Sequence, residues 1–457
     1  MHVLTIRAET KIVEHSNDFY APVSYLKILS FNIVKKEFVD DSWKQILLNI
    51  PIITTQNGMI IDKVPDILRI NSTSYNTEEI DHSMDLINVC IDSALTTQHL
   101  IPEVTESMQI LSSVLCNGSL SISGLVSDYT SSIDFDTEVT SIFRQLLEIL
   151  TLNKMEMKHV FAVTVYCSQM GNFRHLNKVY QKYFAHNPPT RITIGIQIPN
   201  DKGLQMDIIA SKSASNGLHV QSISYWAPAN IGPYSQAKEV DGLLHLAGQI
   251  GLLPESMELH TDSRLQARQI LTNIMQILRC WPEFNPNPVL VICYLINQRD
   301  HDSIRKIFEK DWKNVVFVYV KELPRSANIE IATIFGNGET EMKILNSRFS
   351  DDYLHVDRKI SEVGSARISV ISFNADNVTQ NVISQAKHYI SDTQTGLGVH
   401  SRVYYLERFN STLISSMFAN SCATFAPCHH LGESFIVIVI IENVGIHDDS
   451  GLENVLS

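Results

Sequence analysis

Three segments of the sequence repeat one order of predicted elements: strand, helix, strand, helix, strand, strand. They begin near residues 119, 242 and 366, at an interval of about 123 residues. Short apolar or alternating runs predict the strands, and apolar residues at helical spacing predict the helices. Repetition at one interval predicts copies of a single α+β unit, in which two helices cover one face of a mixed sheet.

The second face of each predicted sheet also carries apolar residues, so each sheet needs a partner on both faces. The simplest partner is another copy of the unit, because short connections hold the copies at a high effective concentration. The sequence therefore favours an α+β fold class with three units packed as an internal pseudo-trimer. Three independent α+β units in a row are the alternative.

The boundaries of the units follow from changes in composition along the sequence. The predicted units are residues 105–212, 223–337 and, more loosely, 365–445. Residues 212–222 and 338–364 are rich in Ser, Asn, Gly and charged side chains and are predicted to be linkers. Residues 31–104 show no clear period and are predicted to be a connector.

Charge and hydropathy exclude some classes of protein. The 457 residues carry a formal net charge of −13, which argues against a general nucleic-acid binder, since phosphate contacts need a surplus of Lys and Arg. The longest apolar runs, 289–296 and 435–441, are shorter than the roughly 18 residues of a membrane helix. The N-terminal sequence lacks a signal-peptide pattern, and the seven cysteines form no CxxC motif. We therefore predict a cytoplasmic protein with reduced thiols and no membrane contact.

The second unit contains the clearest motifs. The sequences YWAPANIGPYSQA at 225–237, LAGQIG at 246–251 and LPRSANIEI at 323–331 resemble the RidA family, also called YjgF or UK114. The resemblance covers 225–336 well and 105–212 moderately, whereas the third unit matches only in the order of its elements. It implies chorismate-mutase-like α+β units that associate as trimers, with ligand sites in the clefts between units.

A further motif precedes the repeats. The sequence TKIVEHSNDFYAPVSYL at 10–26 resembles the end of the ATP-dependent domain of diphthine–ammonia ligases. In fungal and plant members of that family two RidA-like domains follow, in the order found here. The resemblance implies a remnant of the ligase domain at 1–30. It also implies the family's reaction, in which ATP and ammonium amidate diphthine on elongation factor 2, and that factor as a partner.

The ATP-binding part of such a ligase is expected to lie outside this sequence. Its phosphate-binding loop, of the SGGKDS kind, does not occur in these residues, so no residue is assigned to ligation. We expect a truncated product or a derived protein that supplies the accessory RidA-like region. Cys422, Cys428, His429 and His430 lack a second ligand pair at a fixed spacing, and no metal is predicted.

The resemblance to RidA also implies a set of site residues. In deaminating members an arginine binds the substrate carboxylate, a glutamate places the attacking water, and a tyrosine and an asparagine line the site. The first unit keeps the arginine and asparagine as Arg191 and Asn177, but has Gln205 at the glutamate position. The second unit keeps the tyrosine and glutamate as Tyr234 and Glu330, but has Val315 and Arg305 at the other two positions.

These incomplete sets complement each other, and we expect one composite cleft formed by Arg191, Asn177, Tyr234 and Glu330. A guanidinium group suits a small carboxylate because it can donate two parallel hydrogen bonds. A separation above about 15 Å between the guanidinium and both Tyr234 and Glu330 would exclude such a cleft. The alternative is that the charged residues are ordinary strand-end charges and that the tyrosine packs in a turn.

Three functions remain open from the sequence. The first is the accessory region of a diphthine–ammonia ligase, which would dock elongation factor 2, hold an oligomer together or bind a small carboxylate. The second is a stand-alone small-molecule binding protein or imine deaminase, and the third is an interaction scaffold without a ligand. The assembly would be a monomeric pseudo-trimer or a homo-oligomer.

Overall fold

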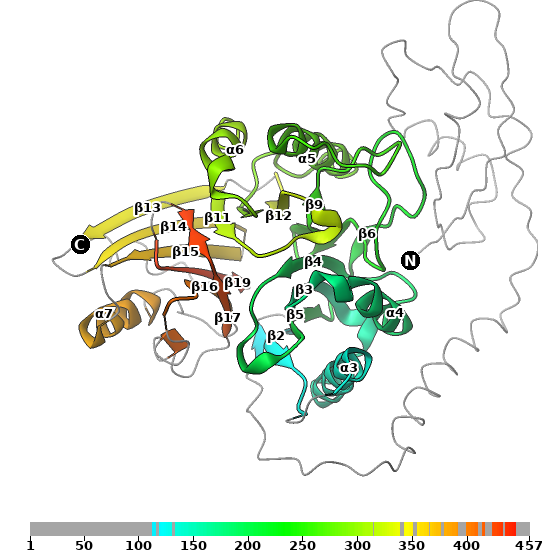
Figure 1. Cartoon of the computed structure of the whole chain (residues 1–457), viewed down its shortest axis with the longest axis horizontal. Helices are drawn as coiled ribbons and strands as arrows, with labels where there is room; N and C mark the ends of the chain where they lie inside the picture. The colour runs from blue at the N-terminus through cyan, green and yellow to red at the C-terminus, as the bar shows by residue number, and fades with distance from the viewer. Residues whose placement is uncertain are drawn as a thin grey trace, which may run out of the picture.

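The structure, a computed structural model, describes a large part of the sequence that follows residue 111. The described residues are 112–444, without 116–117, 130–132, 314, 339–341, 351–353, 365, 376–378, 392–398, 410–413, 416–422 and 433–434. The predicted ligase remnant at 1–30 and connector at 31–104 lie outside them. The described residues form mixed sheets with helices packed on them, which confirms the α+β class (Figure 1).

The first unit is a sheet in the order β1-β2-β5-β3-β4, covered by helices α3 and α4. Its elements are β1 (Ser112–Leu115), β2 (Ser119–Val126), α3 (Phe135–Leu152), β3 (Val160–Cys167), α4 (Phe173–Tyr183), β4 (Thr190–Gly195) and β5 (Leu204–Ser211). Strands β3 and β4 are parallel, and the other neighbours are antiparallel. Helix α3 begins after Asp134, whose side chain accepts a hydrogen bond from the Thr137 backbone N–H.

The second unit has the sheet order β11-β10-β12-β8-β7-β6. Its elements are β6 (Asn216–Leu218), β7 (Ala237–Val240), β8 (Leu243–Leu246), β9 (Gln249–Ile250), α5 (Ser263–Leu278), β10 (Leu290–Leu295), α6 (His301–Phe308), β11 (Val315–Tyr319) and β12 (Ile329–Gly336). The short strand β9 pairs with β12, and β18 (His430–Leu431) from later in the sequence pairs with β11.

The third unit has the sheet order β13-β14-β15-β19-β16-β17. Its elements are β13 (Lys343–Ser350), β14 (His355–Val363), β15 (Ala366–Asn374), α7 (Gln380–Ser391), β16 (Val399–Leu406), β17 (Ala423–Cys428) and β19 (Val437–Val444). Strands β14-β15-β19-β16-β17 have the same order and directions as β1-β2-β5-β3-β4 and β7-β8-β12-β10-β11. The three sheets therefore share one topology.

Both predicted linkers contain strands that the sequence did not indicate. Residues 216–218 form β6, and β13 and β14 form an antiparallel hairpin within 338–364. Strand β13 is an edge strand whose side chains are mostly exposed, so it needs few apolar residues. Its polar sequence therefore resembles a linker, although its backbone pairs with β14 along the whole strand.

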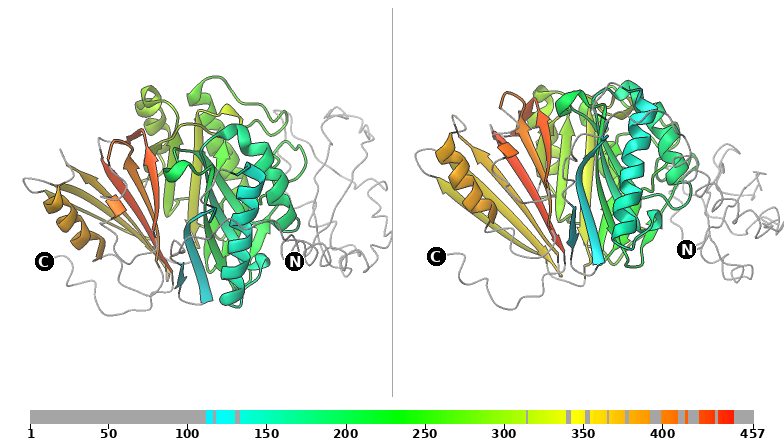
Figure 2. Two further views of the ribbon diagram at one scale, coloured as in Figure 1. Left: turned by 60° about the horizontal axis from the view of Figure 1, so that its bottom comes forward. Right: turned by 90° about the horizontal axis from the view of Figure 1, so that it is seen from below.

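The three sheets face a shared interior, with helices on the outside. Figure 2 shows α3 and α4 at one end of the molecule and α7 at the other, with the sheets between them. Tyr166, Tyr294 and Tyr404 occupy the same place on β3, β10 and β16, and all three are fully buried. The Tyr294 and Tyr404 hydroxyl groups are 2.7 Å apart, which links the second and third units. No helix of the described residues is both long and apolar enough for a membrane crossing.

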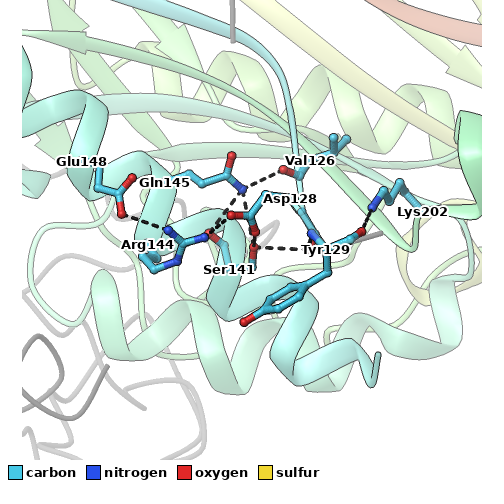
Figure 3. A network of polar contacts seen from close by, with 9 residues as sticks. Val126, Asp128, Tyr129, Ser141, Arg144, Gln145, Glu148 and Lys202 are labelled. Carbon is cyan, nitrogen blue, oxygen red and sulfur yellow. Dashed lines mark hydrogen bonds and ion pairs between the residues drawn. The ribbon is translucent and has the colours of Figure 1, made fainter. Parts of the chain in front are cut away.

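A polar network attaches helix α3 to the end of β2 (Figure 3). The Asp128 carboxylate accepts a 2.5 Å hydrogen bond from the Ser141 hydroxyl and pairs with Arg144. Gln145 Nε2 donates to the Val126 carbonyl at 2.9 Å. Partial burial of Asp128 opposes ionisation, but the bonds from Ser141 and Arg144 outweigh it and lower the pKa of this carboxyl group.

The network predicts unequal effects for its two acidic residues. Asp128→Ala should lower the free energy of unfolding by about 1 kcal/mol, because it leaves the buried Ser141 hydroxyl without its acceptor. Glu148→Ala should cost less than about 0.5 kcal/mol, since Glu148 pairs with Arg144 on the exposed face of the helix. Urea unfolding of both variants measures the difference, and equal costs would contradict the role given to Asp128.

Candidate ligand-binding cleft

A cavity lies where the first and second units meet. It is bounded by β4 and α4 on one side and by β12 and the 225–237 loop on the other, and holds about 450 Å³, part of it open to solvent. The backbones of the two units are joined there, since the Gly248 N–H donates to the Arg191 carbonyl at 3.0 Å. The polar side chains on its lining are Arg191, Thr193, Tyr234, Gln236, Gln249 and Glu330.

Arg191, the second residue of β4, carries a buried positive charge in this cavity. Its Cζ atom lies 5.2 Å, 4.9 Å and 5.5 Å from the ring centres of Phe173, Tyr180 and Tyr234. Such rings attract a cation without neutralising it. Burial lowers the pKa of the guanidinium, and its Nη1 atom has no hydrogen-bond partner in the described part of the protein. The site is therefore short of an anion.

Glu330, the second residue of β12, faces the same cavity from the second unit. Its Oε1 accepts a hydrogen bond from the Thr193 N–H at 3.3 Å, whereas its Oε2 is buried and has no partner in the described structure. Burial raises the pKa of this carboxyl group to about 8, although the Thr193 bond and the Arg191 charge oppose the rise. At pH 7 the carboxyl group is mostly protonated, and the cleft keeps the positive charge of Arg191.

Two glycines let the second unit approach these side chains closely. A Cβ atom at Gly248 would lie 1.8 Å from Glu330 Oε1, and one at Gly232 would lie 2.5 Å from Arg191 Nη2. Any side chain at either position would displace a functional group of the cleft. The glycines of the LAGQIG and YWAPANIGPYSQA motifs therefore shape this site.

The structure brings together three of the four residues expected in the composite cleft. Arg191, Tyr234 and Glu330 line one cavity, and the 5.5 Å from Arg191 to the Tyr234 ring is far below the excluding distance of about 15 Å. Asn177 does not line the cavity; its Nδ2 lies 3.5 Å from the Ile231 carbonyl oxygen of the 225–237 loop. A role in ligand binding stays a prediction for all four.

The other three residues at the expected site positions lie outside the cavity lining. They are Gln205, Val315 and Arg305. Gln205 is opposite Tyr166 in the first sheet, as Glu330 is opposite Tyr294 in the second. Val315 pairs with Val291, as Arg191 pairs with Val163. Arg305 forms an ion pair with Glu309 on α6. The strand registers thus place Gln205 at the position equivalent to Glu330, and Val315 at the position equivalent to Arg191.

Sequence reasoning missed Phe173, Tyr180 and Thr193. Thr193 lies two residues after Arg191 on the same strand, so the alternation of a strand could have found it. Phe173 and Tyr180 lie on α4, and their contact with Arg191 depends on how the helix packs on the sheet. No group of three or more His, Cys, Asp or Glu that could hold a metal ion occurs in the described residues.

Comparison with known proteins identifies the family of the two units that form this cleft. A sequence model of the family described as Endoribonuclease L-PSP matches residues 105–211 and 225–335, the two parts that form the cleft. The 2-iminobutanoate/2-iminopropanoate deaminase of Mus musculus is 34% identical over 118 residues, which cover 24% of this chain and 87% of the deaminase. The chain belongs to this family of RidA-like proteins.

Longer matches connect the protein with one kind of enzyme. The diphthine–ammonia ligase of Schizosaccharomyces pombe is 32% identical over 232 residues, covering 48% of this chain and 38% of the ligase. That of Saccharomyces cerevisiae is 25% identical over 338 residues, covering 63% of this chain and 48% of the ligase. The chain thus resembles diphthine–ammonia ligases and spans less than half the length of each.

Proposed function

We propose that this chain is the RidA-like region of a diphthine–ammonia ligase and that the cleft between its first two units binds a small carboxylate. The observation that carries the ligand is the buried Arg191 guanidinium, which has an unpartnered Nη1 beside a mostly protonated Glu330. A carboxylate would supply the missing anion and accept hydrogen bonds from both groups. The similarity to two ligases beyond the single RidA-like unit supports the wider role.

In this role the RidA-like units do not carry out the ligation themselves. ATP would activate the carboxylate of diphthine on elongation factor 2, and ammonia would displace the activated oxygen to form the amide. The ATP site belongs to another part of the ligase in this proposal, and no described residue is assigned to it. The RidA-like units would bind elongation factor 2 or report the level of a carboxylate metabolite.

Cells without the gene for this protein test the proposed ligase role. Elongation factor 2 from such cells should carry the free acid of diphthine, and the gene should restore the amide, as read by mass spectrometry of the modified peptide. Arg191→Ala in the restored gene tests whether the cleft contributes. A factor that stays fully amidated without the gene would refute the ligase role and leave carboxylate binding open.

Imine deamination is a second candidate, favoured by the meeting of Arg191, Tyr234 and Glu330 at one cavity. Arg191 would hold the carboxylate of a 2-imino acid, and Glu330 would position water at the imine carbon. A carboxyl group with a pKa near neutral pH suits proton transfer to the departing nitrogen. The imino acid and water would give the 2-oxo acid and ammonia, so the reaction balances without a further reactant.

An ammonia-release assay with 2-iminopropanoate tests this candidate. The protein should release ammonia faster than buffer, and Arg191→Ala should lower the rate by at least about 100-fold because it removes the group that orients the substrate. Arg279→Ala, on the exposed end of α5, should keep the full rate. A rate equal to that of buffer would eliminate the deaminase and leave the binding role intact.

A further inference from the structure

A second cavity lies at the centre of the molecule, where the three sheets face one another. It holds about 480 Å³, part of it open to solvent, and is separate from the cleft at Arg191. Five charged or titratable residues line it. They are Asp207 from the first unit, His245 from the second, and His400, Arg402 and Glu442 from the third. All five are at least nine-tenths buried.

Most of these groups have partners within the protein. Arg402 and Glu442 form a buried ion pair. The Asp207 carboxylate accepts hydrogen bonds from the Tyr166 hydroxyl at 2.8 Å, from the Gly124 N–H at 2.9 Å and from the Thr424 hydroxyl. His400 Nδ1 lies 2.7 Å from the Ser121 hydroxyl oxygen. The cluster is thus held in place by bonds between the first and third units.

Two buried polar atoms and one imidazole ring on the lining have no hydrogen-bond partner in the described structure. Arg402 Nε and Thr333 Oγ1 are buried without a hydrogen bond. His245 contacts the Phe161 ring edge-on, at 5.1 Å between ring centres, and no hydrogen bond to its ring is found among the described residues. Burial lowers the pKa of His245 to about 4, so at neutral pH its ring offers one donor and one acceptor. Buried polar groups are seldom left unpaired in proteins, so these atoms require a polar molecule in the cavity as a partner.

The charges and walls of the cavity define the chemistry of that molecule. Two carboxyl groups face one guanidinium, which favours a ligand with a positive group. Arg402 Nε can only donate a hydrogen bond, which requires an acceptor on the same ligand. The remaining wall is largely aliphatic, formed by Ile209, Leu246, Ile292 and Ile334. A molecule with an ammonium group, a carboxylate and a short aliphatic side chain satisfies all three conditions.

We propose that the central cavity is a binding site for a small zwitterionic α-amino acid. The carboxylate accepts hydrogen bonds from Arg402 Nε and the Thr333 hydroxyl, and the ammonium group offsets the charge of Asp207 and Glu442. The aliphatic wall receives the side chain. Because strands of all three units line the cavity, the ligand stabilises their association.

Calorimetric titration at pH 7 tests this site with three probes. It uses the full-length protein carrying Arg191→Ala, which removes the carboxylate-binding group of the first cleft. L-Alanine has both charged groups, propanoate has only the carboxylate, and 2-aminopropane has only the ammonium group. L-Alanine should bind saturably and at least about tenfold more tightly than the other two, since each lacks one of two charge-assisted contacts. Equal affinity for either single-charge probe, or no saturable heat with L-alanine, would overturn the proposal.

Two variants locate the binding. Thr333→Val keeps the shape of the side chain but removes its hydroxyl, and should weaken L-alanine binding about three- to tenfold. Arg191→Ala removes the anion-binding group of the first cleft and should leave the central site able to bind L-alanine. Loss of binding in Arg191→Ala with full affinity in Thr333→Val would place the amino acid in the first cleft and refute the central site. Arg402 is left intact because its removal would strand the buried Glu442 charge.

Discussion

Arg191→Met should abolish carboxylate binding while making the protein more stable. The substitution removes the guanidinium that is expected to pair with the ligand, so affinity for a probe such as 2-oxopropanoate should fall by at least about 100-fold. It also replaces a buried cation that has no ion-pair partner among the described residues with an apolar side chain of similar length. Removing that burial cost should raise the free energy of unfolding by about 1–2 kcal/mol.

The opposite signs of these two effects separate a ligand-binding arginine from a structural one. A structural arginine that is replaced in this way would lower stability without a specific loss of binding. Arg279→Met, on the exposed end of α5, is the matched control and should change neither quantity. Calorimetric titration and urea unfolding give both readings. Unchanged affinity for every small carboxylate tested would show that Arg191 is not the anion-binding group.

The unmodified protein should become less stable as pH rises because of Glu330, and Glu330→Gln should abolish this pH dependence. The carboxyl group has a pKa of about 8 in the folded protein and an ordinary, much lower pKa in the unfolded state. Between about pH 4.5 and pH 8 the unfolded state has released this proton and the folded protein has kept it, so stability falls with rising pH. Glutamine remains neutral, and the variant should be more stable by roughly 3 kcal/mol at pH 7.

The size of that gain should depend on pH in a defined way. It should be near zero at pH 4, where both states are protonated, and should reach its full value above pH 8. Glu283→Gln, an exposed position, should show no such trend and controls for the loss of one acidic residue. Urea unfolding at several pH values measures the difference between each variant and the unmodified protein. A constant difference across this range would contradict a raised pKa for Glu330.

The sequence predicted the sheets well because their core strands are short apolar runs that occur in the same order in each unit. The apolar run 289–296 contains β10, and the predicted order of strand, helix, strand, helix, strand, strand is found in the first two units. Strand β13 could not be found in this way, since an edge strand takes its hydrogen bonds from a neighbour and leaves its side chains in water. Its place in a sheet depends on tertiary structure rather than on its own sequence.

The candidate site was predictable only in part, for a similar reason. The motif positions indicated Arg191, Tyr234 and Glu330. We expected these residues to meet because the first unit keeps the arginine and the second keeps the tyrosine and the glutamate. The rings of Phe173 and Tyr180 beside Arg191 are set by how α4 packs on the sheet. The raised pKa of Glu330 is a consequence of burial, which depends on the completed fold. That Arg191 lacks a negatively charged partner among the described residues could be recognised only from the completed fold.

Carrying three sheets of one topology on a single polypeptide allows their equivalent positions to differ. The position of Arg402, beside Ile440, corresponds by strand register to Thr164, beside Asp207, and to Ile292, beside Ala332. In a ring of identical subunits a substitution occurs once in every subunit, so an arginine here would bring three like charges into one buried space. On one polypeptide the arginine occurs once: it pairs with Glu442 of its own unit and shares the cavity with Asp207 of the first unit. Covalent joining thus permits an interior with different groups at equivalent positions, which an assembly of identical subunits cannot have.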